Sequence, residues 1–185
     1  MKFKIIILAS ACICNFLCLA QNGVYFTKEA FQKDSISPDY TVISWQQKTS
    51  ISFGHSGQVV TLKLNELYAY TDKSGELVRV HPKEGPQKMF IEGSICLYGF
   101  PFHKFEGRGG PCPEFTTKIP NMEFYISSSR KGDLLVANPK NLKKLLGDDL
   151  EIFEAYKINN NIAEAVCAYN KKHPTSSDKF YYRGK

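Results

Sequence analysis

Histidine is the side chain most often used as a general base, and four histidines follow residue 20: His55, His81, His103 and His173. A nucleophilic hydrolase places such a base beside a Ser or Cys, usually with an acid that orients it. Local motifs that would indicate this chemistry, such as G-x-S-x-G and H-E-x-x-H, do not occur in the chain. The catalytic residues are therefore unknown, and a small periplasmic hydrolase remains only an alternative function.

Three cysteines also follow residue 20, namely Cys96, Cys112 and Cys167. In an oxidising compartment one pair could form a disulfide, and we select Cys96 and Cys112 because they bracket the most irregular part of the chain. The alternative is three reduced thiols, with Cys167 on the buried face of a helix. Since no C-x-x-C pair occurs after residue 20, we expect no metal site, and we expect no cofactor.

The segment from Gly99 to Pro120 combines 22 residues with four Gly, four Pro and four Phe. Loops of this length are uncommon in compact domains and are often functional. Its phenylalanines either fold back over the sheet or present a surface to a partner. In the second case the predicted contact residues are Phe100, Phe102, Phe105 and Arg108.

The elements that would position these residues fall into two parts, and the first is a β-rich part over residues 21–137. Val60, Leu62 and Leu64 alternate with polar residues, which is the period of a half-buried strand. Short apolar runs on either side of turn residues predict hairpins. The predicted hairpin strands are Leu67–Tyr70 with Leu77–Val80, and Met89–Ile91 with Ile95–Tyr98.

The second part is helical and covers residues 138–173. Asn138 is placed to cap a first helix, Pro139 fits its first position and Gly147 is placed to end it. Asp148 or Asp149 would cap a second helix, and a third ends before Pro174. Residues 174–185 are predicted to be a loose basic tail. The fold class is α+β: an antiparallel meander or partly open barrel followed by three short C-terminal helices.

Residues 1–20 have the three-part pattern of a signal peptide, with cleavage expected after Ala20. Lipidation at Cys14 or Cys18 is a weaker alternative, because neither follows a small residue. The expected location is therefore the periplasm, the cell surface or the medium. Without these residues the net charge is +4, and neither a nucleic-acid motif nor a permanent membrane span is present.

The chain resembles a group of small exported proteins of Bacteroidota that have no assigned activity. The resemblance rests on short stretches over most of the chain: Gly23–Thr27 with Phe31, the hairpin from Leu67 to Val80, the strand near Tyr98, and Asn138–Leu142. It implies an envelope location and a single domain with β-structure before helices. It supplies no catalytic or binding residue.

The combined expectation is an exported, non-catalytic binding module. A protein or glycan in the cell envelope is the expected partner. The two alternatives to this binding module are a small periplasmic hydrolase and a structural subunit of a surface assembly.

Overall fold

A computed structural model gives the structure of residues 22–46, 49–100, 104–106, 114–117, 123–176 and 179–180. The predicted signal peptide, residues 1–20, lies outside these described residues, so export remains a prediction. Within the described residues no helix is long and apolar enough to cross a membrane.

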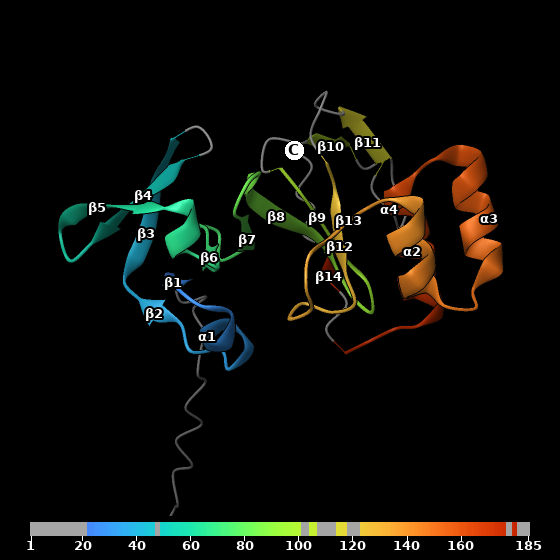
Figure 1. The fold of residues 1–185 in the computed structure, drawn as a ribbon, viewed down its shortest axis with the longest axis horizontal. Coiled ribbons are helices and arrows are strands. Elements are labelled where there is room, and N and C mark those ends of the chain that lie inside the picture. The colour runs from blue at the N-terminus through green and yellow to red at the C-terminus, as the bar shows by residue number, and fades with distance from the viewer. Residues whose placement is uncertain are drawn as a thin grey trace, which may run out of the picture.

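One open antiparallel sheet forms the centre of the fold (Figure 1). Its strands lie in the order β13-β12-β9-β8-β7-β6-β1-β2, and β14 pairs with β8 outside this path. In chain order the described strands of this sheet are β1 (Gly23–Tyr25), β2 (Ser37–Pro38), β6 (Ala69–Thr71), β7 (Leu77–His81), β8 (Gly85–Glu92), β9 (Cys96–Gly99), β12 (Tyr125–Ser127), β13 (Leu135–Val136) and β14 (Lys179–Phe180).

Two smaller antiparallel sheets complete the β-structure. The first, which we call the projecting sheet, contains β3 (Tyr40–Gln46), β4 (Ser50–His55) and β5 (Gln58–Lys63), in that spatial order. A short 3-10 helix, η1 (Leu64–Glu66), follows β5 directly. The second sheet pairs β10 (Lys104–Glu106) with β11 (Glu114–Thr117).

Three helices follow the β-structure: α2 (Pro139–Leu146), α3 (Leu150–Asn159) and α4 (Ile162–Lys172). The Asn138 side chain accepts a hydrogen bond from the Asn141 amide at 2.9 Å, which caps α2 as predicted. Gly147 ends that helix with φ at +60°, a conformation that glycine adopts without strain. A short helix that the sequence did not predict, α1 (Lys28–Gln32), precedes β2.

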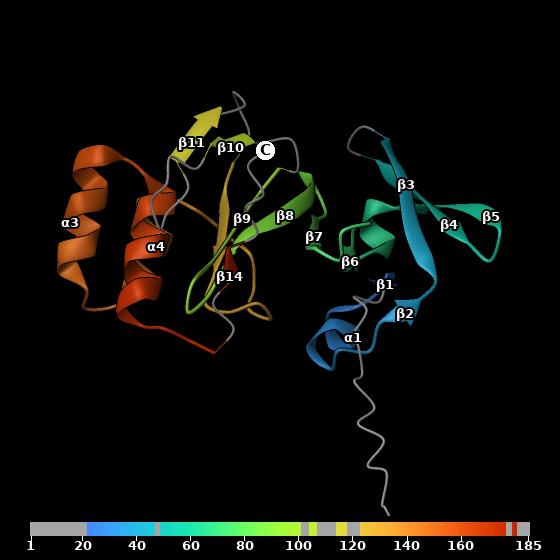
Figure 2. The same cartoon turned by 180° about the vertical axis from the view of Figure 1, so that it is seen from behind.

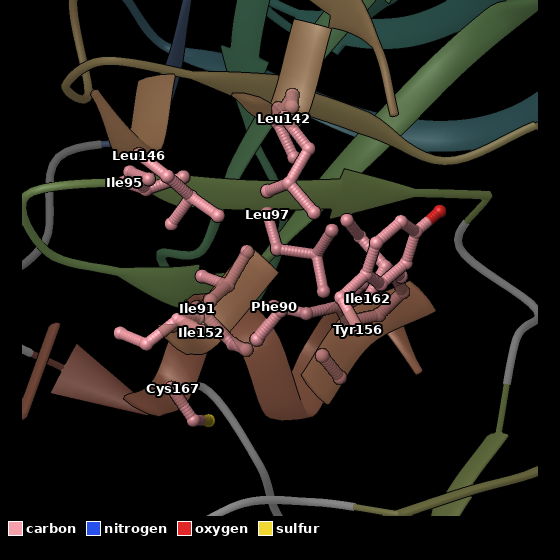
Figure 3. Close-up of a cluster of buried hydrophobic side chains, with 14 residues drawn as sticks. Phe90, Ile91, Ile95, Leu97, Leu142, Leu146, Ile152, Tyr156, Ile162 and Cys167 are labelled. Carbon is pink, nitrogen blue, oxygen red and sulfur yellow. The ribbon is translucent and has the colours of Figure 1, made fainter. Parts of the chain in front are cut away.

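The central sheet has a different cover on each face. Along β7, Val78 and Val80 pack with the projecting sheet, whereas Leu77 lies on the opposite face in a cluster with Phe31 of α1. The three C-terminal helices cover β8, β9 and β12, at the end of the central sheet remote from the projecting sheet (Figures 1 and 2). The pairing register of β7, β8 and β9 places both covers on the same face of the central sheet. Figure 3 shows the helical core, in which Leu97 of β9 meets Leu142 and Tyr156.

The predicted α+β class, with an open antiparallel sheet before three C-terminal helices, is confirmed. Two segments are more ordered than predicted. The irregular segment after Gly99 contains the β10–β11 pair, and in the tail Lys179 and Phe180 pair with Glu92 and Ile91 of β8. The tail is therefore not loose at these two residues, because β8 extends past β7 and leaves main-chain groups for another strand.

Candidate functional site

The projecting sheet stands at the end of the molecule remote from α3 and α4, and β5 lies at its outer side in both views (Figures 1 and 2). A two-residue turn, Ser56–Gly57, connects β4 to β5. Both residues have positive φ, 49° and 78°, which is the signature of a type I′ turn. The pairing then runs without a shift from His55–Gln58 to Ser50–Lys63.

This turn determines which groups of β5 remain unpaired. Residues that flank a two-residue turn form a hydrogen-bonded pair, and hydrogen-bonded pairs alternate along an antiparallel ladder. Gln58, Val60 and Leu62 therefore bond to β4. Val59 and Thr61 direct their N–H and C=O groups away from β4, and no described strand pairs with β5 on that side.

The third outward residue, Lys63, is partly occupied. Its N–H donates to the Glu66 carboxylate at 2.8 Å, so the side chain from η1 covers the end of the strand. The open edge of β5 thus consists of the main-chain groups of Val59 and Thr61. We call these two residues the open edge.

The other edge strands of the central sheet and of the projecting sheet are short or irregular, which hinders pairing with another chain. β2 and β13 have two residues each, and β3 carries a register shift between Val42 and Ser44. Among these edge strands β5 alone combines six regularly paired residues with an open side. Its β-branched composition, Gln-Val-Val-Thr-Leu-Lys, suits an extended chain.

The two faces of β5 offer different side chains to a neighbour. Val60 and Leu62 lie opposite the buried Phe53 and Ile51, on the face that packs against the body. On the outer face Thr61 hydrogen-bonds to Ser52 at 3.0 Å. Val59 is 69% exposed on this outer face, opposite Gly54, which supplies no side chain to cover it.

The predicted contact surface of Phe100, Phe102, Phe105 and Arg108 is described only in part. Phe100 is buried, which agrees with the covering role that was the alternative for this loop. Phe105 lies in β10 and pairs across to Phe115 of β11, whereas Phe102 and Arg108 lie outside the described residues. A binding role for the loop remains a prediction.

The predicted disulfide is not tested either, because Cys112 lies outside the described residues. Cys96 is buried, and its thiol donates to the Gly93 carbonyl at 3.6 Å. Burial raises the pKa of this thiol, which keeps it protonated and unreactive at neutral pH. Cys167 is buried in α4, as predicted for a reduced thiol.

Three of the four histidines are described, and each has a contact that positions it structurally; His103 lies outside the described residues. His55 stacks on Tyr40 at 4.1 Å between ring centroids, and His81 accepts a hydrogen bond from the Glu84 amide at 3.2 Å. His173 binds Asp149 at 2.7 Å.

The His173–Asp149 pair resembles two members of a catalytic triad, but its surroundings differ. The nearby Ser94 hydroxyl donates to the main-chain carbonyl of His173, not to its ring. Asp149 also binds Lys172, and the two donors hold the pKa of its carboxyl below the ordinary value. The contacts of Asp149 with Lys172 and His173 therefore join the start of α3 to the end of α4. Of the two predicted caps, Asp148 and Asp149, it is Asp149 that occupies the N-cap position, but its carboxylate makes no capping hydrogen bond.

A shallow groove of about 290 Å³ lies between these two helices. Ala155, Ala165 and Ala168 lie among its lining residues, and Asn159 donates to Glu164 at its rim, 2.8 Å away. This volume is at the lower limit of pockets that hold small-molecule ligands.

Sequence reasoning missed a buried arginine, Arg79 of β7, which is 2% exposed. Its guanidinium donates to the Gly132 carbonyl at 3.0 Å and to the Tyr68 hydroxyl at 2.6 Å. The rings of Tyr68 and Phe31 lie 4.6 and 4.8 Å from its central carbon, so cation–π contacts replace a carboxylate. Arg79 therefore joins α1 and the loop before β13 to the sheet.

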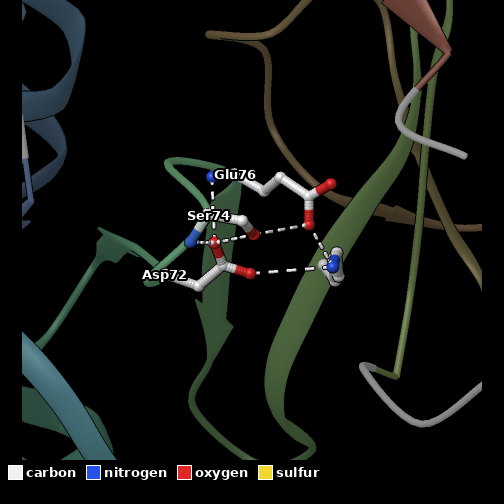
Figure 4. A network of polar contacts seen from close by, with 4 residues as sticks. Asp72, Ser74 and Glu76 are labelled. Carbon is white, nitrogen blue, oxygen red and sulfur yellow. Dashed lines mark hydrogen bonds and ion pairs between the residues drawn. The ribbon is translucent and has the colours of Figure 1, made fainter. Parts of the chain in front are cut away.

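An acidic cluster in the β6–β7 turn is also structural (Figure 4). One oxygen of Asp72 accepts hydrogen bonds from the amides of Ser74 and Glu76, at 2.9 and 3.0 Å. Lys88 of β8 forms ion pairs with Asp72 and Glu76. The cluster closes the turn onto the neighbouring strand, and Lys88 already occupies the place where a cation would bind.

Comparison with protein-family models, with curated proteins and with solved structures found no match for this chain.

Proposed function

We propose that the protein is an exported, non-catalytic binding protein of the cell envelope or the medium. Its binding element is the open edge of β5, to which a partner adds an extended strand. The observation that carries this proposal is the six-residue regular edge strand at the end of the projecting sheet, with Val59 and Thr61 unpaired.

Strand addition explains features of β5 that the fold itself does not require. Main-chain hydrogen bonds to Val59 and Thr61 would supply affinity, and alternate side chains would supply selectivity. On the inner side, an apolar partner side chain would continue the core beyond Val60 and Leu62. On the outer side, the partner would cover Val59, which is 69% exposed.

The histidines that could support a hydrolase have structural contacts wherever the structure describes them. His173 and Asp149 tie two helices together, and His81 accepts a main-chain amide hydrogen bond. These contacts favour binding over catalysis as the activity of the protein.

The test compares Thr61→Pro with Thr61→Val in the tagged, exported protein. Proline removes one outward N–H and leaves the β4–β5 hydrogen bonds intact, so an edge strand accommodates it. Valine keeps the N–H and, like proline, loses the Ser52 hydrogen bond, which makes it the matched control. Circular dichroism and thermal unfolding verify that both variants fold.

We expect partners that co-purify from gently solubilised envelope to be lost from Thr61→Pro and retained by Thr61→Val. Retention of every partner by a folded Thr61→Pro protein would refute the proposal. A double Phe102→Ser and Arg108→Ser variant that alone loses the partner would place the binding site on the loop instead.

A further inference from the structure

The open edge also indicates which strand is added, and this inference rests on the proposed function. We infer that the partner strand is β5 of a second copy of this chain. The two copies of β5 would pair antiparallel about a two-fold axis that passes beside Val60. The two projecting sheets would then form one continuous six-stranded sheet.

The available main-chain groups select this register. A two-fold axis beside Val60 places Val59 of each copy opposite Thr61 of the other. Each of these two pairs exchanges two N–H···O bonds, so about four bonds form and every group of the open edge is used. The axis one residue further on would instead place Val59 opposite Lys63, whose N–H already donates to Glu66.

The side chains agree with the same register. At the axis Val60 meets Val60 of the second copy in a non-hydrogen-bonded pair, where cross-strand side chains approach most closely. On the outer face the exposed Val59 lies beside the Thr61 methyl group of the second copy. Lys63 lies opposite Gly57, so no like charges face each other, and around Gly57 no heavy atom lies within 4 Å of an added Cβ.

The edge position makes the contact sterically accessible. β5 lies at the end of the molecule opposite the C-terminal helices in both views (Figures 1 and 2). A contact through one strand edge is smaller than a stable interface of about 1,000 Å², so association is expected at roughly micromolar to millimolar concentrations. Such an edge suits a subunit that assembles where the chain is concentrated.

The test is a cysteine cross-link in a Cys112→Ser background, since Cys96 and Cys167 are buried. Val60→Cys places two thiols across the axis about 4.5 Å apart at Cα, within the range of a disulfide. Thr61→Cys is the control, because its two copies are offset by two residues and lie about 8 Å apart. Both variants are mildly oxidised at high protein concentration and analysed on a non-reducing gel.

The inference predicts a covalent dimer from Val60→Cys at several times the yield from Thr61→Cys, and its loss when Thr61→Pro is added. Equal yields from both cysteine variants, together with a monomer in sedimentation at millimolar concentration, would overturn it. If Thr61→Pro still abolishes capture of another protein in that case, self-pairing fails and the proposed function stands. If Thr61→Pro changes neither measurement, both are overturned.

Discussion

Asn170 of α4 and Gly93 of the β8–β9 turn form a contact whose energy can be measured by a double-mutant cycle. Asn170 is 1% exposed, and its amide both accepts from the Ile95 N–H and donates to the Ile95 carbonyl, each at 2.8 Å. The Asn170 side chain therefore attaches α4 to the sheet through two hydrogen bonds to one main-chain residue, as a neighbouring strand residue would do. Gly93 lies directly beneath it, where an added Cβ would be 2.4 Å from the Asn170 nitrogen.

Both single substitutions should destabilise the fold by similar amounts. Asn170→Ala leaves the buried N–H and carbonyl of Ile95 without partners, at about 1–3 kcal/mol each, so we expect a loss of about 3 kcal/mol. Gly93→Ala forces the Asn170 amide away and breaks the same two hydrogen bonds, which gives a similar loss. In the double variant the added Cβ no longer meets the Asn170 amide, so the loss of stability should stay at about 3 kcal/mol rather than double.

The assay is urea unfolding followed by circular dichroism, with equal slopes required for all four proteins. Lys171→Ala, an exposed neighbour on α4, is the control and should change stability by less than about 0.5 kcal/mol. Additive losses in the double variant would refute the proposed contact, as would a Gly93→Ala protein as stable as the parent.

Two further predictions concern polar groups. Arg79→Lys keeps the charge but loses the forked hydrogen bonds to the Gly132 carbonyl and the Tyr68 hydroxyl, so urea unfolding should show a loss of about 3 kcal/mol; a loss below about 1 kcal/mol would contradict the assignment. The folded pKa of Asp149 lies below its ordinary 3.8, so the stabilisation from this carboxylate is present above that pH and is lost as pH falls through the lowered value. Asp149→Asn should therefore have a flatter dependence of unfolding free energy on pH in this acid range, and parallel curves for the two proteins would exclude the effect.

Local sequence signals predicted those elements whose stabilising contacts are themselves local. The hairpins follow from short apolar runs around turn residues, and Asn138, Pro139 and Gly147 define α2 because capping involves neighbours in the chain. α1 was missed because it is five residues long and its core residue, Phe31, packs against Tyr68 and Arg79, which lie far from it in the sequence. β14 was missed because it pairs with the part of β8, Ile91 and Glu92, that β7 does not reach, and the sequence does not show how far β7 extends along β8.

In the candidate site too, local features were predicted and features that depend on distant parts of the chain were not. Alternation of Val60 and Leu62 with polar residues predicted the strand β5, but nothing in that pattern shows which strand is an edge. The open edge follows from the order of strands and from the Glu66 contact at Lys63, which exist only in the folded chain. Arg79 occupies a position in β7 that resembles a solvent-facing one until α1 covers it.

The most direct test of the central claim is residue-resolved amide hydrogen exchange along β5. In the free protein the amides of Val60 and Leu62 bond to β4 and should exchange slowly, while those of Val59 and Thr61 should exchange at nearly unprotected rates. In the complex isolated from the envelope, or in the concentrated protein, the account predicts that Val59 and Thr61 become protected as well. Unchanged rapid exchange at both residues while a partner is bound would contradict it.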